Sequence, residues 1–406
     1  MSSRPDQPST ATEQDPVAPD VPRDLSPQDL ADIVDGAAFL SAGGGGAKAL
    51  GQELIKVMSG STVRMIGVGD VADTDYVICS AYIGSPAAAL KLKSPTFNSL
   101  SRAIEALEHA AGVKASHVVP GEIGAVNSIA PILAARDRGL SVVDADGCGR
   151  AVPLIAATTF GLENSLASFG AAVANDANDA AAYQTAVLSA TTTSGLQGSI
   201  GALAMSAPYG ALCGTALWLM MGAQLKRYAV PYCLSRSRQI GEALRRASGD
   251  YASMMVRLLG SMGLPARVLF DGSLLTPVSF TVHTQDAHDL GTVVLKRADG
   301  KGTVTVFSLN ENILAYDSGA GAPVILMPDM MCWLGEDGAT FDNAQLQSDI
   351  QQGRAKPMYA IGVEAVQKVG VAGAGGPFRD YPGIAPYMAA IMGAVGYAGA
   401  YEPFKA

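Results

Sequence analysis

The sequence predicts an α/β N-terminal domain with a mixed, largely parallel sheet, followed by an α+β C-terminal domain that contains an antiparallel β-rich module. First, 406 residues are too many for one typical domain. Second, helical and strand patterns alternate from residue 26 to about residue 174, which is typical of βαβ units. Third, residues at about 266–330 form short alternating runs separated by turn residues, which indicates antiparallel strands.

The first domain, expected at residues 26–190, follows a polar tail. Residues 1–25 are rich in Pro, Asp, Ser, Thr and Gln and have few apolar residues, so we expect them to be disordered. Ser26 followed by Pro27 is a helix-start signal. The apolar patterns then predict helices at 27–40, 47–58, 96–111 and 126–136 and strands at 62–66, 76–81, 117–120 and 140–143.

The second domain, expected at residues 191–406, begins within an uncharged segment. Residues 180–225 carry no charge, and residues 200–223 are long enough to span a bilayer. Their Ser, Thr, Gln and Gly content, with Pro208, favours a buried helix or loop cluster instead, so we expect no membrane partner. A helix with Arg and Glu on one side is predicted at 237–259.

Composition excludes several classes of partner. The net charge of −9 argues against nucleic acid, which needs a basic face. Hydrophobic residues make up 49% of the chain and charged residues 16%, so much surface is buried and we expect a homo-oligomer. The five cysteines form no CxxC pair, and the N-terminal residues lack a secretory signal. We therefore expect a cytoplasmic protein with a small-molecule substrate.

Two carboxylates, a thiol and a guanidinium follow the strand predicted at 140–143. Asp144, Asp146, Cys148 and Arg150 would lie beyond the carboxyl end of this strand, where open α/β sheets bind their ligands. The alternative is a loop whose aspartates cap the next helix and whose glycines only turn the chain.

A second strand end repeats this arrangement. Glu122 and Asn127 follow the strand predicted at 117–120, so two loops deliver acidic side chains to one edge of the sheet. Helix capping alone does not explain both loops, which favours a pocket. A carboxylate pair acts as acid and base or holds a divalent metal, so the cofactor stays open.

Four consecutive glycines form a third region of interest: Gly43, Gly44, Gly45 and Gly46. Their N–H groups could approach an anionic or carboxylate group of the substrate, and a predicted helix N-terminus follows them. The alternative is a purely steric turn. The run has neither the GxGxxG spacing after a strand nor the Gly-Lys-Ser/Thr ending of a P-loop, so no nucleotide or organic cofactor is indicated.

Three residues of types that commonly bind metal ions lie close together in the sequence: His283, Asp286 and His288. They lie in a turn between predicted strands and match no standard spacing, and the alternative is a solvated loop. The chain has four histidines and no nucleophile-elbow signature, so we predict no Ser-His-Asp triad.

These motifs together resemble the S-methyl thiohydantoin desulfurase family. The resemblance is carried by the glycine run, Pro-Gly-Glu-Ile-Gly-Ala-Val-Asn-Ser at 120–128, Asp-Ala-Asp-Gly-Cys-Gly-Arg-Ala-Val-Pro at 144–153, Thr158-Thr159-Phe160 and Asn310-Glu311-Asn312. It covers most of residues 26–386 and implies an N-terminal α/β domain and a C-terminal domain with a β-rich part. Members of the family often occur beside hydantoinase genes.

The resemblance also implies hydrolytic attack on a carbon of a hydantoin-like ring, with loss of methanethiol from an S-methylated thiohydantoin. It implies functional roles only for Glu122, Asn127, Asp144, Asp146 and Arg150, and we expect Thr158 and Thr159 to bind the substrate as well. Three positions depart from the pattern: Ala47 and Leu154 replace residues that are commonly acidic, and Cys148 replaces a common methionine.

We therefore predict a hydrolase that acts on a small hydantoin- or thiohydantoin-like ring. Asp144 or Asp146 would activate water as the general base, and Arg150 would neutralise the developing anion. Cys148 would be the nucleophile if Arg150 lowers its pKa, and otherwise it is a small buried hydrophobe. Two further functions stay open: a lyase, cyclase or isomerase of a related ring, and a non-catalytic subunit of a hetero-oligomer.

Overall fold

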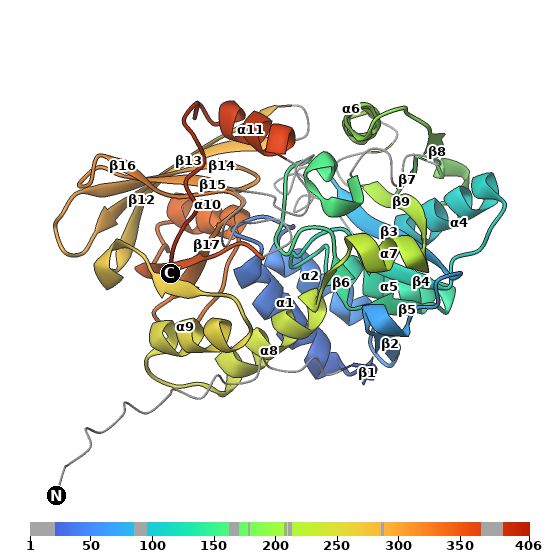
Figure 1. Ribbon diagram of the computed structural model, residues 1–406, viewed down its shortest axis with the longest axis horizontal. Helices are drawn as coiled ribbons and strands as arrows, with labels where there is room; N and C mark the ends of the chain where they lie inside the picture. Colours follow the sequence, from blue (N-terminus) through green and yellow to red (C-terminus); the bar gives the residue numbers. More distant parts are fainter. Residues whose placement is uncertain are drawn as a thin grey trace, which may run out of the picture.

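The computed structural model of the chain describes residues 21–84, 96–161, 170–177, 179–206, 209, 213–285, 288–366 and 385–406. Within these residues the strands form two eight-stranded sheets and one two-stranded sheet. Figure 1 shows the C-terminal sheet in orange tones on the left and the N-terminal sheet in blue to green on the right. The predicted fold class, α/β followed by α+β with an antiparallel module, is confirmed.

The N-terminal sheet is mixed. In their order across the sheet, its strands are β1 (Arg23–Leu25), β2 (Val63–Ile66), β5 (Ser141–Val143), β4 (His117–Pro120), β3 (Tyr76–Ile83), β9 (Cys213–Met221), β7 (Ala171–Asn175) and β8 (Thr185–Leu188). The four strands β2, β5, β4 and β3 pair in parallel, as the alternating pattern predicts. The others pair antiparallel with their neighbours.

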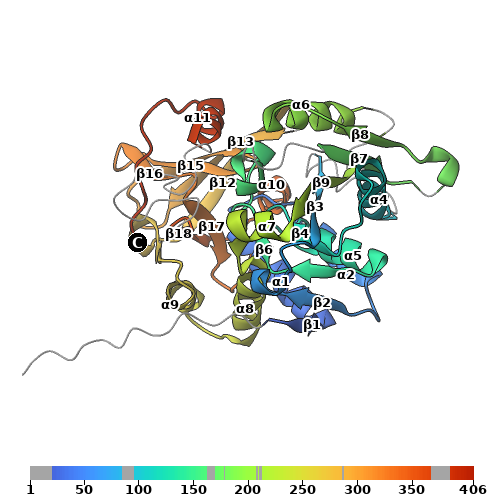
Figure 2. The same ribbon diagram turned by 45° about the vertical axis from the view of Figure 1, so that its right-hand side comes forward.

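Helices cover this sheet. They are α1 (Pro27–Leu40), α2 (Lys48–Val57), α4 (Ser99–Ala111), α5 (Ile129–Arg138), α6 (Thr193–Ala204) and α7 (Gly222–Tyr228). α1 begins where the sequence predicts, because Ser26 and Asp29 form a capping box and Pro27 takes the first helical position. Figures 1 and 2 both place α6 at the same upper edge of the molecule as α11 (Ala385–Ala394).

The C-terminal sheet is antiparallel throughout its described strands. In their order, these are β11 (Ala266–Val268), β18 (Met358–Val363), β12 (Leu275–Gln285), β13 (His288–Arg297), β14 (Thr303–Leu309), β15 (Glu311–Asp317) and β16 (Ala322–Leu326), with β17 (Met330–Gly335) paired to β18. α10 (Asn343–Gln351) contacts β12. A short pair, β6 (Ala145–Asp146) and β10 (Val230–Pro231), follows β5.

Three segments differ from the expectation. Arg23–Leu25, expected in the disordered tail, forms β1, whereas residues 1–20 of that tail lie outside the described residues. The uncharged segment expected as a helix or loop contains β9, whose nearly continuous apolar run is typical of a strand buried on both faces. β9 joins the first sheet, which therefore takes strands from both sides of the domain boundary expected at residue 190; the boundary itself stays a prediction.

The helix predicted at 237–259 is two helices, α8 (Cys233–Arg246) and α9 (Tyr251–Ser261). The break occurs because Gly249 has a φ of 96° and Asp250 caps α9 by accepting a hydrogen bond from the N–H of Ser253. α8 packs directly on α1. A Cβ on Gly36 of α1 would lie 1.8 Å from the carbonyl oxygen of Ser237, so this helix crossing requires glycine.

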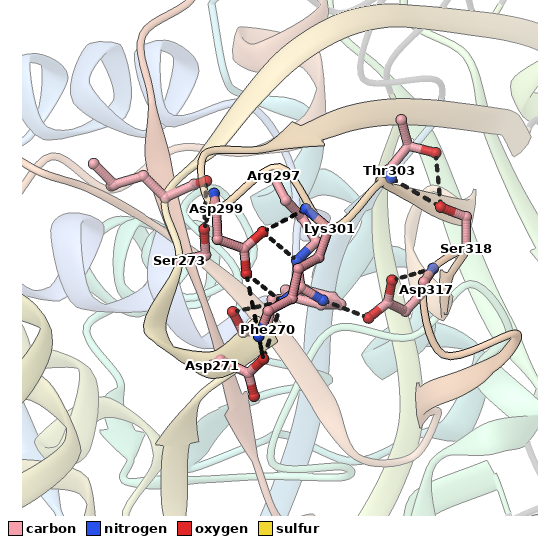
Figure 3. A network of polar contacts seen from close by, with 11 residues as sticks. Phe270, Asp271, Ser273, Arg297, Asp299, Lys301, Thr303, Asp317 and Ser318 are labelled. Carbon is pink, nitrogen blue, oxygen red and sulfur yellow. Dashed lines mark hydrogen bonds and ion pairs between the residues drawn. The ribbon is translucent and has the colours of Figure 1, made fainter.

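A buried arginine ties the turns at one end of the C-terminal sheet together. Arg297 of β13, 4% exposed, pairs with Asp299 and Asp317 at 2.6 Å each and with Asp271 at 3.1 Å. Figure 3 shows these carboxylates around the guanidinium, with Lys301 beside them. The contacts hold three turns of the hairpin module in register, so we assign this cluster a structural role.

Within the described part of the chain, none of the helices combines the length and the apolar character that a membrane crossing requires.

Candidate functional site

A cavity of about 590 Å³ lies between the two parts of the molecule, a volume typical of small-molecule sites. The N-terminal part contributes the glycine loop, the segments that follow β3 and β4, α6 and β9. The C-terminal part contributes His288, Asn310 and Glu311. The site therefore exists only where the two sheets meet.

The glycine loop packs too closely on its neighbours for any larger residue. A Cβ on Gly44 would lie 2.0 Å from Glu311 Oε1, and a Cβ on Gly45 would lie 2.3 Å from the Cα of Gly124. The run thus brings the segment after β4 and the start of β15 to one place. Of the four glycines, Gly45 and Gly46 line the cavity, and the first two pack behind it.

Glu122 reaches the cavity from the segment after β4 and holds two hydrogen bonds. Asn127 Nδ2 donates to its Oε1 at 2.8 Å, and the N–H of Val152 donates to its Oε2 at 2.7 Å. Asn127 is itself held, because its Oδ1 accepts from the N–H of Tyr82 at 2.9 Å. Burial raises the pKa of Glu122 to about 7, although the two hydrogen bonds and the charge of Arg150 act in the opposite direction.

Glu311 reaches the same cavity from the first position of β15. It is 2% exposed. Its Oε1 accepts a long hydrogen bond of 3.4 Å from the N–H of Gly45, and its Oε2 has no partner among the described residues. Burial, followed by the nearby charge of Glu122, raises the pKa of Glu311 well above its ordinary value.

The two carboxyl groups are therefore unequal. Glu122 has a donor on each oxygen, which favours its ionised form, whereas Glu311 has one long hydrogen bond and a free oxygen. Environments that push the pKa values of a pair apart assign one member as base and the other as acid. Such an arrangement can supply a base at Glu122 and an acid at Glu311.

The structure does not bring Asp144 to the cavity. Asp144 is fully buried, and its Oδ1 accepts from the N–H groups of Leu234 and Ser235 at 2.8 and 3.1 Å. The hydroxyl of Ser235 donates to Oδ2. These donors form the first turn of α8, so Asp144 caps a distant helix rather than activating water. The alternative placed these aspartates at the start of the next helix, whereas Asp144 caps α8, which lies far along the chain.

Asp146 and Cys148 also lie outside the cavity lining. Asp146 Oδ2 accepts from the N–H of Gly149 at 2.8 Å, and burial raises the pKa of Asp146 well above its ordinary value. Cys148 is 1% exposed and packs in an apolar cluster with Val152 and Met327. Burial also raises the pKa of the Cys148 thiol well above its ordinary value, which opposes a nucleophilic role.

Arg150 connects the two domains instead of facing the substrate. Its guanidinium donates to the carbonyl oxygens of Pro328, Asp329 and Asn312 at 3.1, 2.8 and 3.0 Å, and it is 1% exposed. Arg150 is not among the residues that line the cavity, so it does not contact a ligand there directly, although its charge acts on Glu122 and Glu311. Its loop still supports the site, because the backbone of the same segment holds Glu122 through Val152.

The two predicted threonines differ in position. Thr158 lines the cavity, where its hydroxyl donates to the carbonyl of Ile155 at 2.8 Å and accepts from the N–H of Gly161 at 3.0 Å. Thr159 is fully buried behind it and donates to the carbonyl of Gly147 at 3.1 Å. Thr158 is thus placed to contact a ligand, and Thr159 holds the loop after β5 through Gly147.

The predicted metal-ligand residues do not form a cluster in the described structure. His288 lines the cavity, with its Nε2 2.8 Å from the carbonyl oxygen of Pro153. His283 is exposed on β12, and Asp286 lies outside the described residues. In the ranges that the structure describes, no three His, Cys, Asp or Glu side chains gather closely enough to hold a metal ion.

Sequence reasoning missed Glu311 and Gln197 as cavity residues. Glu311 lies in one of the motifs that carry the family resemblance, which was the available signal. Gln197 of α6 accepts from the N–H of Ile155 at 2.7 Å and donates to the carbonyl of Pro153 at 3.3 Å. It thereby anchors α6 over the cavity, and nothing in its local sequence indicates this role.

Comparisons with known proteins agree with this two-part layout. The chain matches the S-Me-THD-like N-terminal domain at residues 28–185 and the S-Me-THD-like C-terminal domain at residues 202–355. The crystal structure of a protein from Chromobacterium violaceum is similar, with 25% sequence identity, 94% of this chain and 100% of that chain covered, and a TM-score of 0.77. No curated protein matches the chain.

Proposed function

The chain belongs to the S-Me-THD-like family, and we propose that it hydrolyses an S-methyl thiohydantoin or a related hydantoin-like ring. One observation carries the proposal: two carboxyl groups, the partly buried Glu122 and the buried Glu311, line one cavity from two domains and have different hydrogen-bond partners. A carboxylate base next to a carboxylic acid is what hydrolysis of such a ring needs at neutral pH.

Glu122 is the base in this proposal. It takes a proton from water as the water oxygen bonds to the ring carbon that carries the S-methyl group. The electron pair of the C=N bond moves to the ring nitrogen, which receives that proton. Asn127 and the N–H of Val152 hold the carboxylate in place during the transfer.

Glu311 is the acid. The C–S bond breaks as the new ring carbonyl forms, the electron pair leaves with sulfur, and Glu311 gives its proton to sulfur. The hydroxyl group bonded to the ring carbon gives its proton back to the Glu122–Glu311 pair. The net reaction consumes one water, and its two hydrogens end on the ring nitrogen and on methanethiol. Positioned acid–base groups each contribute roughly 10²–10⁴-fold to such a rate.

The rest of the cavity suits an uncharged ring. Its described lining contains Asn127, Asn310, Gln197 and Thr158 as neutral polar side chains, and it contains no Lys or Arg. Amide and hydroxyl groups recognise the N–H and C=O groups of a hydantoin, whereas a permanent negative charge would meet no Lys or Arg in the described lining.

Thiol release from S-methyl thiohydantoins tests the proposal. We expect the purified chain to release methanethiol, detected with a thiol-reactive dye, and the variants Glu122→Gln and Glu311→Gln to lose about 100-fold or more of kcat. Glu105→Gln, on the exposed face of α4, is the matched control and should keep the wild-type rate.

The result that would overturn hydrolysis is the absence of thiol release from a series of ring substituents by a folded wild-type protein. Release that persists undiminished in both glutamine variants would instead remove the carboxyl pair from the chemistry.

A further inference from the structure

Trp218 occupies an unusual backbone position in the wall of the cavity. Where β9 pairs with β3, Cys79 is opposite Leu217 and Ile78 is opposite Leu219, so Trp218 is the extra residue of a β-bulge. Its φ is 44°, in the left-handed region that a bulky side chain rarely adopts.

The bulge places two consecutive side chains on one face of the sheet. In a regular strand, neighbouring residues point to opposite faces. Here Leu217 and Trp218 both pack in the apolar cluster that contains α6, whereas Ala216 and Leu219 pack in the cluster on the other face. Both Leu217 and Trp218 line the cavity. Bulges beside functional sites often re-aim a side chain in this way.

The indole is held in a fixed orientation. The ring of Phe160 meets it edge to face, with the ring centroids 6.2 Å apart, and Trp218 is 2% exposed. Ile200 and Met205, at α6 and its C-cap, also line the cavity. This end of the cavity is therefore apolar and rigid.

The apolar end lies away from the carboxyl pair. Glu122 follows β4, and β9 is two strands further across the sheet, roughly 10 Å at the usual spacing of strands. A bare five-membered ring at Glu122 and Glu311 would leave this end empty. An apolar substituent on the ring would reach it.

We propose that the cavity selects rings that carry a large, uncharged, apolar substituent, of benzyl size, and that Trp218 is the residue that determines this specificity. The inference rests on the proposed function, because it places the ring at Glu122 and Glu311. The substituent lies against the Trp218 indole, where ring-to-ring contact adds to the burial of apolar surface. A carboxylate substituent is rejected, because the described lining contains no Lys or Arg and already holds the Glu122 carboxylate.

Binding of hydantoins that lack the S-methyl group tests this directly, since they release no thiol and report affinity alone. We compare 5-methyl, 5-benzyl and 5-carboxymethyl hydantoin by titration calorimetry on the whole protein. The benzyl compound should bind about 10- to 100-fold more tightly than the methyl compound, and the carboxymethyl compound should bind most weakly.

A variant pair on β9 then assigns the effect to Trp218. Trp218→Ala should reduce the benzyl-to-methyl affinity ratio by about tenfold. Met220→Ala is the matched control, because Met220 is buried in the same cluster on the same strand and does not line the cavity. It should lower stability and leave the ratio unchanged. The wild-type series needs no variant, so it is informative even if Trp218→Ala fails to fold.

The two proposals fail in different ways. No thiol release together with a strong benzyl preference in binding removes the hydrolysis and keeps the specificity. Thiol release with equal affinity for methyl and benzyl rings, or an unchanged ratio in Trp218→Ala, overturns the specificity alone. Absence of binding by all three hydantoins overturns it as well.

Discussion

Glu122 and Glu311 line one cavity from two different domains, and the charge of Glu122 helps to raise the pKa of Glu311, after burial itself. The glycine loop lies between them: Gly45 donates to Glu311, and the Cα of Gly124, two residues after Glu122, packs against it. The protonation state of Glu311 therefore depends in part on the charge of Glu122. The predictions below follow from this relationship and from the contacts that hold it.

The pair predicts a bell-shaped pH profile of kcat/KM. Burial raises the pKa of Glu122 to about 7, and the base must be ionised, so the rate should rise as pH increases through about 7. Burial raises the pKa of Glu311 well above its ordinary value, and the acid must be protonated, so the rate should fall at higher pH. Glu311→Gln should remove the alkaline limb, and a limb that persists in this variant would assign it to another group.

The hydrogen bond from Asn127 to Glu122 should set the pH at which the acid limb of kcat/KM lies. Asn127→Asp keeps the acceptor for the N–H of Tyr82 but replaces the donor to Glu122 with a carboxylate. The pKa of Glu122 should rise, because a hydrogen bond to its ionised form is lost and a like charge is gained. The acid limb of kcat/KM should therefore move to higher pH, whereas a merely structural role would lower the rate equally at every pH.

Replacing Asp144 should lower the stability of the fold without lowering kcat. Asp144→Asn weakens the cap of α8 and should lower the free energy of unfolding by roughly 1–2 kcal/mol, measured by urea titration. The folded variant should keep the wild-type kcat. Asp24→Asn, whose carboxylate is exposed, is the control and should change stability by less than about 0.5 kcal/mol. A large loss of kcat at unchanged stability would show instead that Asp144 takes part in catalysis.

The contacts of Arg150 should contribute strongly to the free energy of unfolding. Arg150→Met leaves three buried carbonyl groups of the C-terminal part without their charged donor, so the free energy of unfolding should fall by about 3 kcal/mol or more. Arg246→Met removes an arginine whose side chain is 70% exposed and should have little effect. Similar small losses in both variants would contradict the linking role of Arg150.

Local patterns were sufficient for much of the fold. The capping box at Ser26 and the apolar strand at His117–Pro120 are set by neighbours in sequence, and both occur where predicted. β9 was not predicted, because a strand buried on both faces and a buried helix share one apolar pattern, and the partner strands that decide between them lie far along the chain.

The site was predicted only in its N-terminal half. Glu122 and Asn127 line the cavity, as the strand-end argument expects, and so do Gly45, Gly46 and Thr158, which were expected to contact the substrate on other grounds. Asp144 and Asp146 have the same position at a strand end, yet neither lines the cavity: backbone N–H groups of α8 bind Asp144, and the N–H of Gly149 binds Asp146 Oδ2. The position at a strand end fixes where the backbone of a residue lies. It does not indicate which hydrogen-bond donors from distant segments will bind its side chain.

By itself, the sequence determined the family and the division into an α/β part and an antiparallel part, because motifs, helix starts and strand alternation are local properties. Only the tertiary structure decided that Glu311 is the partner of Glu122, that Arg150 joins the domains and that Trp218 faces the cavity. Each of these depends on contacts between segments distant in sequence, where burial, the pairing of polar groups and strand register are settled together.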